Sequence, residues 1–217
     1  RQLGGNVMYT DTTNASGGGG GKYIWDYMTG FSDQAGAAAN KELMWKRAKG
    51  FMDVVAYTGT GSARTVPHSL GVPPEMIWAR SRTTTEQWVV YHSSTTLGSS
   101  PPESIISYLN LNNRSGVAAN WNNTAPTDSV FSLGTATTVN QSNIPYIAYL
   151  FATLDGVSKC GGYTGNGSSQ TIDCGFSSGS RFVLIHRTDD PDDDGVSGDW
   201  YVWDSLRGIV AGNDPHL

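Results

Sequence analysis

The 217-residue sequence has few charged residues, only two cysteines and no long hydrophobic run. With 15% charged residues and 27 glycines, its composition is far from that of a helical protein. The net charge of −5 argues against binding to nucleic acids or anionic membranes, since both need a basic face. The apolar stretches are short and interrupted, so we expect no membrane insertion. Two cysteines exclude a disulfide-rich scaffold and allow at most one bridge.

What the sequence does contain is a series of short β-prone segments separated by Gly, Pro and Thr clusters. Strands at this density, without intervening helices, predict an all-β fold, either an antiparallel β-sandwich or a jelly roll. The most apolar segment, 146–152, is expected to be a central strand buried on both faces. The predicted strands are 52–57, 63–68, 76–80, 88–91, 105–111, 130–133 and 146–152.

The sequence also repeats itself. The motif Tyr-Thr-Gly-x-Gly at 57–61 returns 106 positions later at 163–167. Segment 76–80 matches 182–186 at that same offset, and segment 88–93 matches 200–205 at an offset of 112. Three matches in the same order indicate an internal duplication. We therefore predict a β-sandwich copy one at 51–155 and a second copy at 156–217.

Residues 1–50 differ from both copies and predict an irregular Gly-rich N-terminal arm or connector. Residues 17–21 are five consecutive glycines, and 23–27 form a short aromatic segment with strand character. Residues 35–49 have the composition of a short helix but could equally be an extended linker.

Copy two has no counterpart of Phe131 or of the apolar segment 146–152. We therefore expect that the parent protein continues beyond Leu217, and that copy two is incomplete or is completed by another chain.

Several motifs carry a resemblance to a known family. They are KRAKGFMDVVAYTGTG at 46–61, HSLGVPPEM at 68–76, WNNTAPT at 121–127, YIAY at 146–149 and GYTGNG at 162–167. Over residues 46–217 the chain resembles a domain of tailed-bacteriophage structural proteins, mostly tail fibres, with a concanavalin A-like (lectin/glucanase) sandwich. The resemblance implies a virion location, other virion proteins as partners, and a homo-oligomer such as a homotrimer. It supplies no active-site residues to carry over to this chain.

The two cysteines are placed symmetrically about a glycine. If 158–163 and 171–176 form a hairpin that turns at Gly167, Cys160 and Cys174 lie opposite each other, close enough for a cross-strand disulfide. Two reduced thiols packed side by side are the favoured alternative.

An acidic stretch in copy two has half of a calcium-loop pattern. Asp190, Asp192 and Asp194 alternate before a glycine, but the twelfth position is a tyrosine where a bidentate Glu belongs. Asp199 could partly substitute for that ligand. The alternative, which the missing Glu favours, is a solvated hairpin tip, since these residues lie in a six-residue insertion that copy one lacks. Calcium is thus the one candidate cofactor.

Among the seven tryptophans, Trp121 is the best candidate for stacking on a sugar, because it lies in a loop-like segment with amide neighbours. Its neighbours Asn120, Asn122 and Asn123 could bond glycan hydroxyls. A buried loop anchor is the favoured interpretation of Trp121.

No catalytic motif accompanies these features: there is no G-x-S-x-G elbow, no paired-histidine metal motif and no P-loop. The leading hypothesis is a non-enzymatic structural virion protein, with adhesion to host-surface glycan as a further role. The alternatives are a glycan-cleaving depolymerase and a stand-alone carbohydrate-binding module on the same scaffold.

Overall fold

A computed structural model describes residues 24–27, 30–32, 45–95, 99–111, 114–116, 118–188, 198 and 200–205. The chain divides into two compact units, Arg1–Lys46 and Arg47–Leu217. This division lies close to the predicted end of the arm. In the first unit, β1 (Ile24–Tyr27) pairs antiparallel with β2 (Gly30–Ser32). Residues 45–47 have no helical structure, and the rest of the helix-or-linker segment, up to 44, lies outside the described residues.

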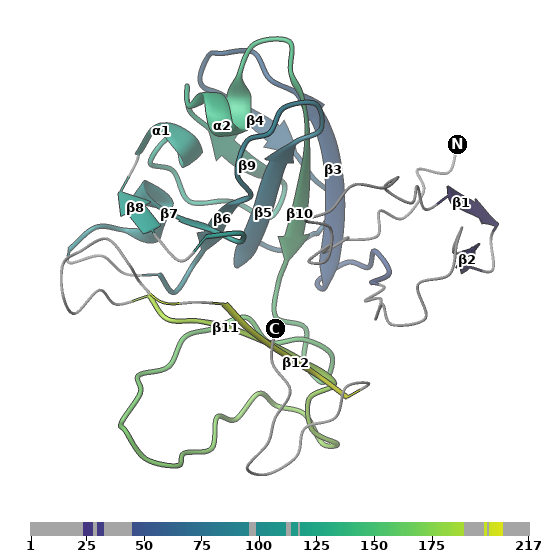
Figure 1. Ribbon diagram of the computed structural model, residues 1–217, viewed down its shortest axis with the longest axis vertical. Coiled ribbons are helices and arrows are strands. Elements are labelled where there is room, and N and C mark those ends of the chain that lie inside the picture. Colours follow the sequence, from purple (N-terminus) through teal and green to yellow (C-terminus); the bar gives the residue numbers. More distant parts are fainter. Residues whose placement is uncertain are drawn as a thin grey trace, which may run out of the picture. The chain divides into compact units, whose positions relative to one another are not determined.

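The second unit contains a six-stranded antiparallel sheet with the strand order β3-β10-β5-β6-β7-β8 (Figure 1). Its strands are β3 (Met52–Thr58), β5 (Met76–Ser81), β6 (Val89–His92), β7 (Ile105–Tyr108), β8 (Arg114–Gly116) and β10 (Pro145–Phe151). Two antiparallel pairs accompany it, β4 (Arg64–Pro67) with β9 (Val130–Leu133), and β11 (Phe182–His186) with β12 (Trp200–Asp204). The helical turns are η1 (Pro102–Ser104), α1 (Ala118–Trp121) and α2 (Thr137–Asn140). In the part of the chain that is described, no helix is long and apolar enough to cross a membrane.

The hydrophobic core lies between the large sheet and the β4–β9 pair. Val66, Phe131 and Leu133 from the small pair belong to the same buried cluster as Ile77 and Leu150 of the large sheet. Two β layers that share one apolar core make a sandwich. The prediction of an all-β antiparallel sandwich is therefore confirmed.

Strand β10 is the central element predicted from its apolar sequence. It pairs with β3 on one edge and with β5 on the other. Its residues Ala148, Tyr149, Leu150 and Phe151 are all buried, so both faces of the strand are covered. Strand β7, in contrast, ends before the predicted 105–111 does, because a turn bond from the amide of Leu111 to the carbonyl of Tyr108 bends the chain away.

The strand register of the two hairpins agrees with the predicted duplication. In copy one, β5 and β6 pair with Met76 opposite His92. In copy two, β11 and β12 pair with Phe182 opposite Asp204. These are the residues that the offsets of 106 and 112 make equivalent. The two hairpins therefore have the same register, although copy two has the longer connection.

The repeat begins earlier than the sequence motifs indicated. An isolated bridge joins Ala48 to Met52, and its counterpart joins Leu154 to Ser158. Each turn contains a glycine with positive φ, at +75° for Gly50 and +69° for Gly156. Both glycines stand at the common offset of 106, which is the signal in the sequence that could have revealed this turn.

Outside the β11–β12 hairpin, the described residues of copy two form no strands. Residues 159–180 run between β10 and β11 without a regular element (Figure 1). The predicted hairpin of 158–163 with 171–176 is therefore wrong. These residues correspond to β3 and β4 of copy one, whose pairing partners are β10 and β9. A strand needs a neighbour for its backbone hydrogen bonds, and no described residue of copy two supplies one.

Candidate functional site

The best-defined candidate feature is the pair of glycine loops, 57–61 in copy one and 163–167 in copy two. In copy one, the ring of Tyr57 stacks on Tyr146, with centroids 5.3 Å apart and planes 11° apart, and meets Phe131 edge-on at 6.0 Å. Its hydroxyl donates a 2.9 Å hydrogen bond to the carbonyl of Val139. Burial, with Tyr146 nearby, raises the pKa of Tyr57 far above its ordinary value. The tyrosine is thus a neutral anchor in the core.

Asn140, at the end of α2, fixes the copy-one loop. Its side chain is 0% exposed. The amide of Thr60 donates to its Oδ1 at 2.9 Å, and its Nδ2 donates to the carbonyls of Ser62 at 2.8 Å and Gly134 at 2.6 Å. Both side-chain donors are therefore used. Its own carbonyl accepts from the amide of Gly61 at 2.7 Å. This buried amide is fully satisfied, so it specifies one loop conformation.

Gly59 is required by a close backbone approach. A Cβ placed on it would lie 2.2 Å from the carbonyl oxygen of Gln141, closer than any real contact. The Gly59 amide donates to Ile144 at 2.8 Å, and its carbonyl accepts from Asn143 at 2.9 Å. All these partners lie between β9 and β10. We call residues 130–151, which comprise β9, α2 and β10, the acceptor segment.

The copy-two loop keeps the motif but lacks these contacts. Gly167 has φ +71°, almost the +73° of its counterpart Gly61. Tyr163, the counterpart of the buried Tyr57, is 51% exposed. A Cβ on Gly165 would meet nothing within 4 Å, in contrast to its counterpart Gly59. Among the described residues, nothing plays the part of the acceptor segment for this loop.

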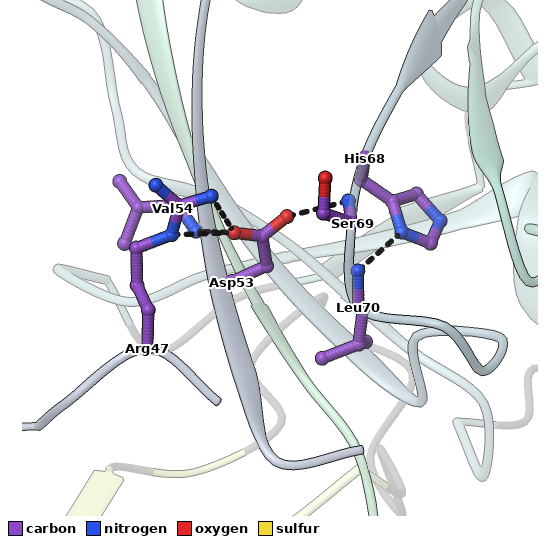
Figure 2. Close-up of polar contacts among 6 residues, drawn as sticks. All are labelled: Arg47, Asp53, Val54, His68, Ser69 and Leu70. Carbon is purple, nitrogen blue, oxygen red and sulfur yellow. Dashed lines mark hydrogen bonds and ion pairs between the residues drawn. The ribbon is translucent and has the colours of Figure 1, made fainter. Parts of the chain in front are cut away.

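A buried carboxylate organises the entry to copy one (Figure 2). Oδ1 of Asp53 accepts from Nε of Arg47 at 2.7 Å and from the amide of Val54 at 2.9 Å, and Oδ2 accepts from the amide of Ser69 at 2.7 Å. Asp53 thereby joins the chain before β3 to the loop after β4. It acts as a structural carboxylate, since its oxygens are occupied by protein donors.

Next to this network, His68 is held in one tautomer. Its Nδ1 accepts from the amide of Leu70 at 3.2 Å, so Nε2 carries the proton and donates to the carbonyl of Thr127 at 3.1 Å. The ring therefore bridges two loops. Figure 2 shows its imidazole directed away from Asp53, which places no acid–base pair here.

Glu75, which precedes β5, acts electrostatically on both His92 and Cys160. Burial lowers the pKa of His92, and Glu75 opposes that shift. Burial, reinforced by Glu75, raises the pKa of the Cys160 thiol to about 12. A nucleophilic cysteine needs a depressed pKa. The shift has the opposite sign here, so the thiol stays protonated and packs as an apolar group.

The predicted glycan residues are neighbours in sequence but differ in exposure. Trp121 is 2% exposed and meets Tyr91 edge-on at 5.9 Å, so its indole cannot stack on a sugar. The glycan contact predicted for it is wrong, and the buried anchor is correct. Asn120 is buried and donates to Oγ1 of Thr138 at 2.9 Å. Asn122 and Asn123 are exposed in left-handed backbone conformations.

The remaining candidate sites have different outcomes. Cys160 and Cys174 are free thiols, so the structure contains no disulfide between them. The calcium candidates Asp190, Asp192, Asp194 and Asp199 lie outside the described residues. Within the described ranges, no three His, Cys, Asp or Glu side chains are grouped so that they could hold a metal ion.

The hairpin of copy two contacts copy one. The indole Nε1 of Trp200 donates a 2.9 Å hydrogen bond to the carbonyl of Tyr108 at the end of β7. Trp200 also stacks on His186, with centroids 4.2 Å apart. The equivalent pair in copy one is Trp88 with Arg80, whose guanidinium lies 5.3 Å from the ring centroid. Each hairpin therefore keeps a basic residue against a tryptophan.

Comparison with known proteins identifies the family. Residues 3–214 match a family described as a domain of unknown function, DUF7483. The chain belongs to the DUF7483 family. No curated protein and no solved structure matches the chain. Because the function of the DUF7483 family is unknown, the function of this chain has to be inferred from its own residues.

Proposed function

We propose that this chain is a structural protein of a tailed-bacteriophage virion, a segment of a tail fibre or another external appendage. The observation that carries the proposal is the duplicated β unit, which repeats its turn and its hairpin register within one chain. Tandem copies of one module suit a protein that extends a surface outward.

The residues that carry the phage resemblance are framework residues. Segment 46–61 contains Asp53 and the copy-one glycine loop, and 68–76 contains the loop that Asp53 holds. Segment 146–149 lies in the central strand β10. A resemblance built on such residues supports a shared scaffold, which we propose to be concanavalin A-like. It supports a mechanical role more directly than a chemical one.

The proposal includes homotrimeric assembly with other virion proteins and places no glycan site at Trp121, because that indole is buried. The proposal includes contact with host glycan as a secondary activity of the appendage. The runner-up, a depolymerase, would need a carboxylate pair across a groove.

The test is the composition of purified phage particles from a host culture whose phage carries the gene. We expect mass spectrometry to find the chain in the particles, and gold-labelled antibodies to mark an external appendage. Absence from intact particles would contradict the proposal. Release of oligosaccharide from host capsule or lipopolysaccharide by the purified chain would instead favour the depolymerase.

A further inference from the structure

We propose that copy two is a docking surface for a separate polypeptide segment that resembles the acceptor segment of copy one. The surface consists of residues 158–172, including the glycine loop 163–167. The proposal concerns a partner that the virion assignment does not name, and it stands on the repeat alone. If the chain were absent from phage particles, the virion assignment would fail, but this docking proposal would still stand.

The first observation is the location of exposed apolar side chains. Five large hydrophobic residues of the described chain are exposed, and only Leu111 belongs to copy one. The others are Val157 at 57%, Tyr163 at 51%, Ile172 at 46% and Tyr201 at 40%. Of these, Tyr163 and Ile172 belong to the proposed surface, and exposed large apolar side chains are typical of interaction sites.

The second observation is that two of these residues replace buried ones at the common offset. Tyr163 corresponds to Tyr57, and Ile172 corresponds to Val66, which is 1% exposed in β4. In copy one, both counterparts are covered by the acceptor segment: Tyr57 by Tyr146 and Phe131, and Val66 by its partner in β9, again Phe131. The side chains therefore suit an apolar partner that copy two does not contain among its described residues.

The third observation is Gly165. Glycine costs conformational entropy and is retained where a backbone passes close by. Gly165 has open space around it, so copy two alone gives no steric reason for a glycine. Its counterpart Gly59 faces the Gln141 carbonyl. The glycine is explained if a similar carbonyl approaches when a partner binds.

Copy one defines the chemistry of the occupant. The occupant should contain three elements in order: a short strand with an aromatic residue like Phe131, a helical turn that ends in an asparagine like Asn140, and an apolar strand that begins near a tyrosine like Tyr146. The register follows from β3 and β10, where Thr58 lies opposite Pro145 and Met52 opposite Phe151. On binding, residues 158–164 should become a strand in that register, with Ser158 opposite the counterpart of Phe151.

The experiment uses the full chain and a synthetic peptide of residues 128–153 as the probe. Hydrogen–deuterium exchange with mass spectrometry follows the amides of 158–172. We expect the peptide to slow exchange in this stretch at least about tenfold, because new strand hydrogen bonds protect amides. Exchange in β3 should stay unchanged, which separates docking on copy two from displacement of the chain's own β10.

The matched control is Gly165→Ala. It should leave the stability of the free chain unchanged or slightly raised, because its Cβ meets nothing. It should weaken peptide binding by about tenfold or more, since the methyl group would collide with the incoming backbone. A peptide with Asn140→Ala and Tyr146→Ser should also fail to protect.

Two results would overturn the proposal. One is the absence of protection, or equal protection in Gly165→Ala, which would indicate non-specific apolar contact. The other is protection of 158–172 in the chain alone that rises with its concentration. That result would assign the occupant to a second copy instead of a separate segment.

Discussion

Copy one and copy two contain the same Tyr-Thr-Gly-x-Gly motif, yet one motif is buried and the other is exposed. Tyr57 packs between aromatic rings, whereas Tyr163 faces solvent. The loops have nearly the same φ at their last glycine, so the local sequence sets the turn in both. What differs is the acceptor segment, which copy two lacks among its described residues. The motif determines the conformation of the loop, and a segment distant in the sequence determines whether its tyrosine is buried.

The same division runs through the whole repeat. Two features recur in both copies, because in each of them the paired residues are close in the sequence. They are the turn, at 48–52 and 154–158, and the hairpin, β5–β6 and β11–β12. Strands β3 and β4 do not recur because β9 and β10 supply their partners. Elements whose hydrogen-bond partners are near in the sequence are repeated in copy two, and elements whose partners are distant in the sequence are not.

The largest contrast is expected at the two motif tyrosines. Tyr57→Ala removes a stacked, hydrogen-bonded ring from the core and should lower the free energy of unfolding by about 3–5 kcal/mol. Tyr163→Ala removes an exposed ring and should change it by less than about 0.5 kcal/mol. Urea denaturation of both variants measures the difference. Equal effects would show that Tyr163 is already packed in solution.

The glycines should differ next. Gly59→Ala places a methyl group against the backbone carbonyl of Gln141 and should cost about 3 kcal/mol, at the upper end for overpacking. Gly165→Ala should be neutral or slightly stabilising, since alanine reduces the entropy of the unfolded chain. Thermal unfolding of the pair provides the measurement. A destabilised Gly165→Ala would mean that the copy-two loop has a partner within the free chain.

The third contrast concerns Asp53 and its counterpart, Lys159. Asp53→Asn loses the ion pair with Arg47 and can no longer accept all of its donors, so it should cost about 2 kcal/mol. Lys159→Gln changes an exposed side chain and should have little effect on stability. The two variants can be compared by their urea midpoints. If both were neutral, the network in Figure 2 would be dispensable.

The smallest effect should come from His92, whose position in copy two is taken by Asp204. Burial lowers the pKa of His92 below its ordinary 6.5, and its Nδ1 accepts from the amide of Ser94. The unfolded state therefore takes up the proton first. The stabilising contribution of the neutral ring is complete above pH 6.5 and is lost as the pH falls below that value, through the lower pKa of the folded state.

This pH effect is measured by unfolding the wild type and His92→Gln between about pH 7.5 and about pH 5, on either side of the ordinary histidine pKa. The variant should lose less stability over that range than the wild type. An identical pH dependence of both proteins would contradict the assignment.

The sequence predicted most of copy one because its strands have strong local signals. Strand β9 lies where it was predicted, at 130–133, and β10 was identified by its continuous apolar run. The turns α1 and α2 were missed because four residues carry no helical periodicity. The partner of the glycine loop was also missed, since Asn140 lies 80 positions from Thr60. Non-local contacts leave no pattern within a short window of sequence.

The symmetry of the two cysteines misled the prediction of a hairpin at 158–176. Their equal distances from Gly167 suggested facing strands, but positions 158–164 correspond to β3, which pairs with β10 in copy one and not with β4. Trp121 was assigned correctly as an anchor because a large indole is most stable when it is buried. Aligning the copies predicted β11 and β12, and their register agrees with that alignment.

The exposed stretch 161–173 also affects how readily proteases cleave the protein. Extended, exposed backbone is what a protease cleaves first, and the tryptic sites Lys159 and Arg181 stand exposed on either side of it. The sandwich of copy one offers no comparable stretch of successive exposed residues in its described part. A segment docked on copy two would shield this stretch, so resistance to trypsin would distinguish assembled molecules from unassembled ones.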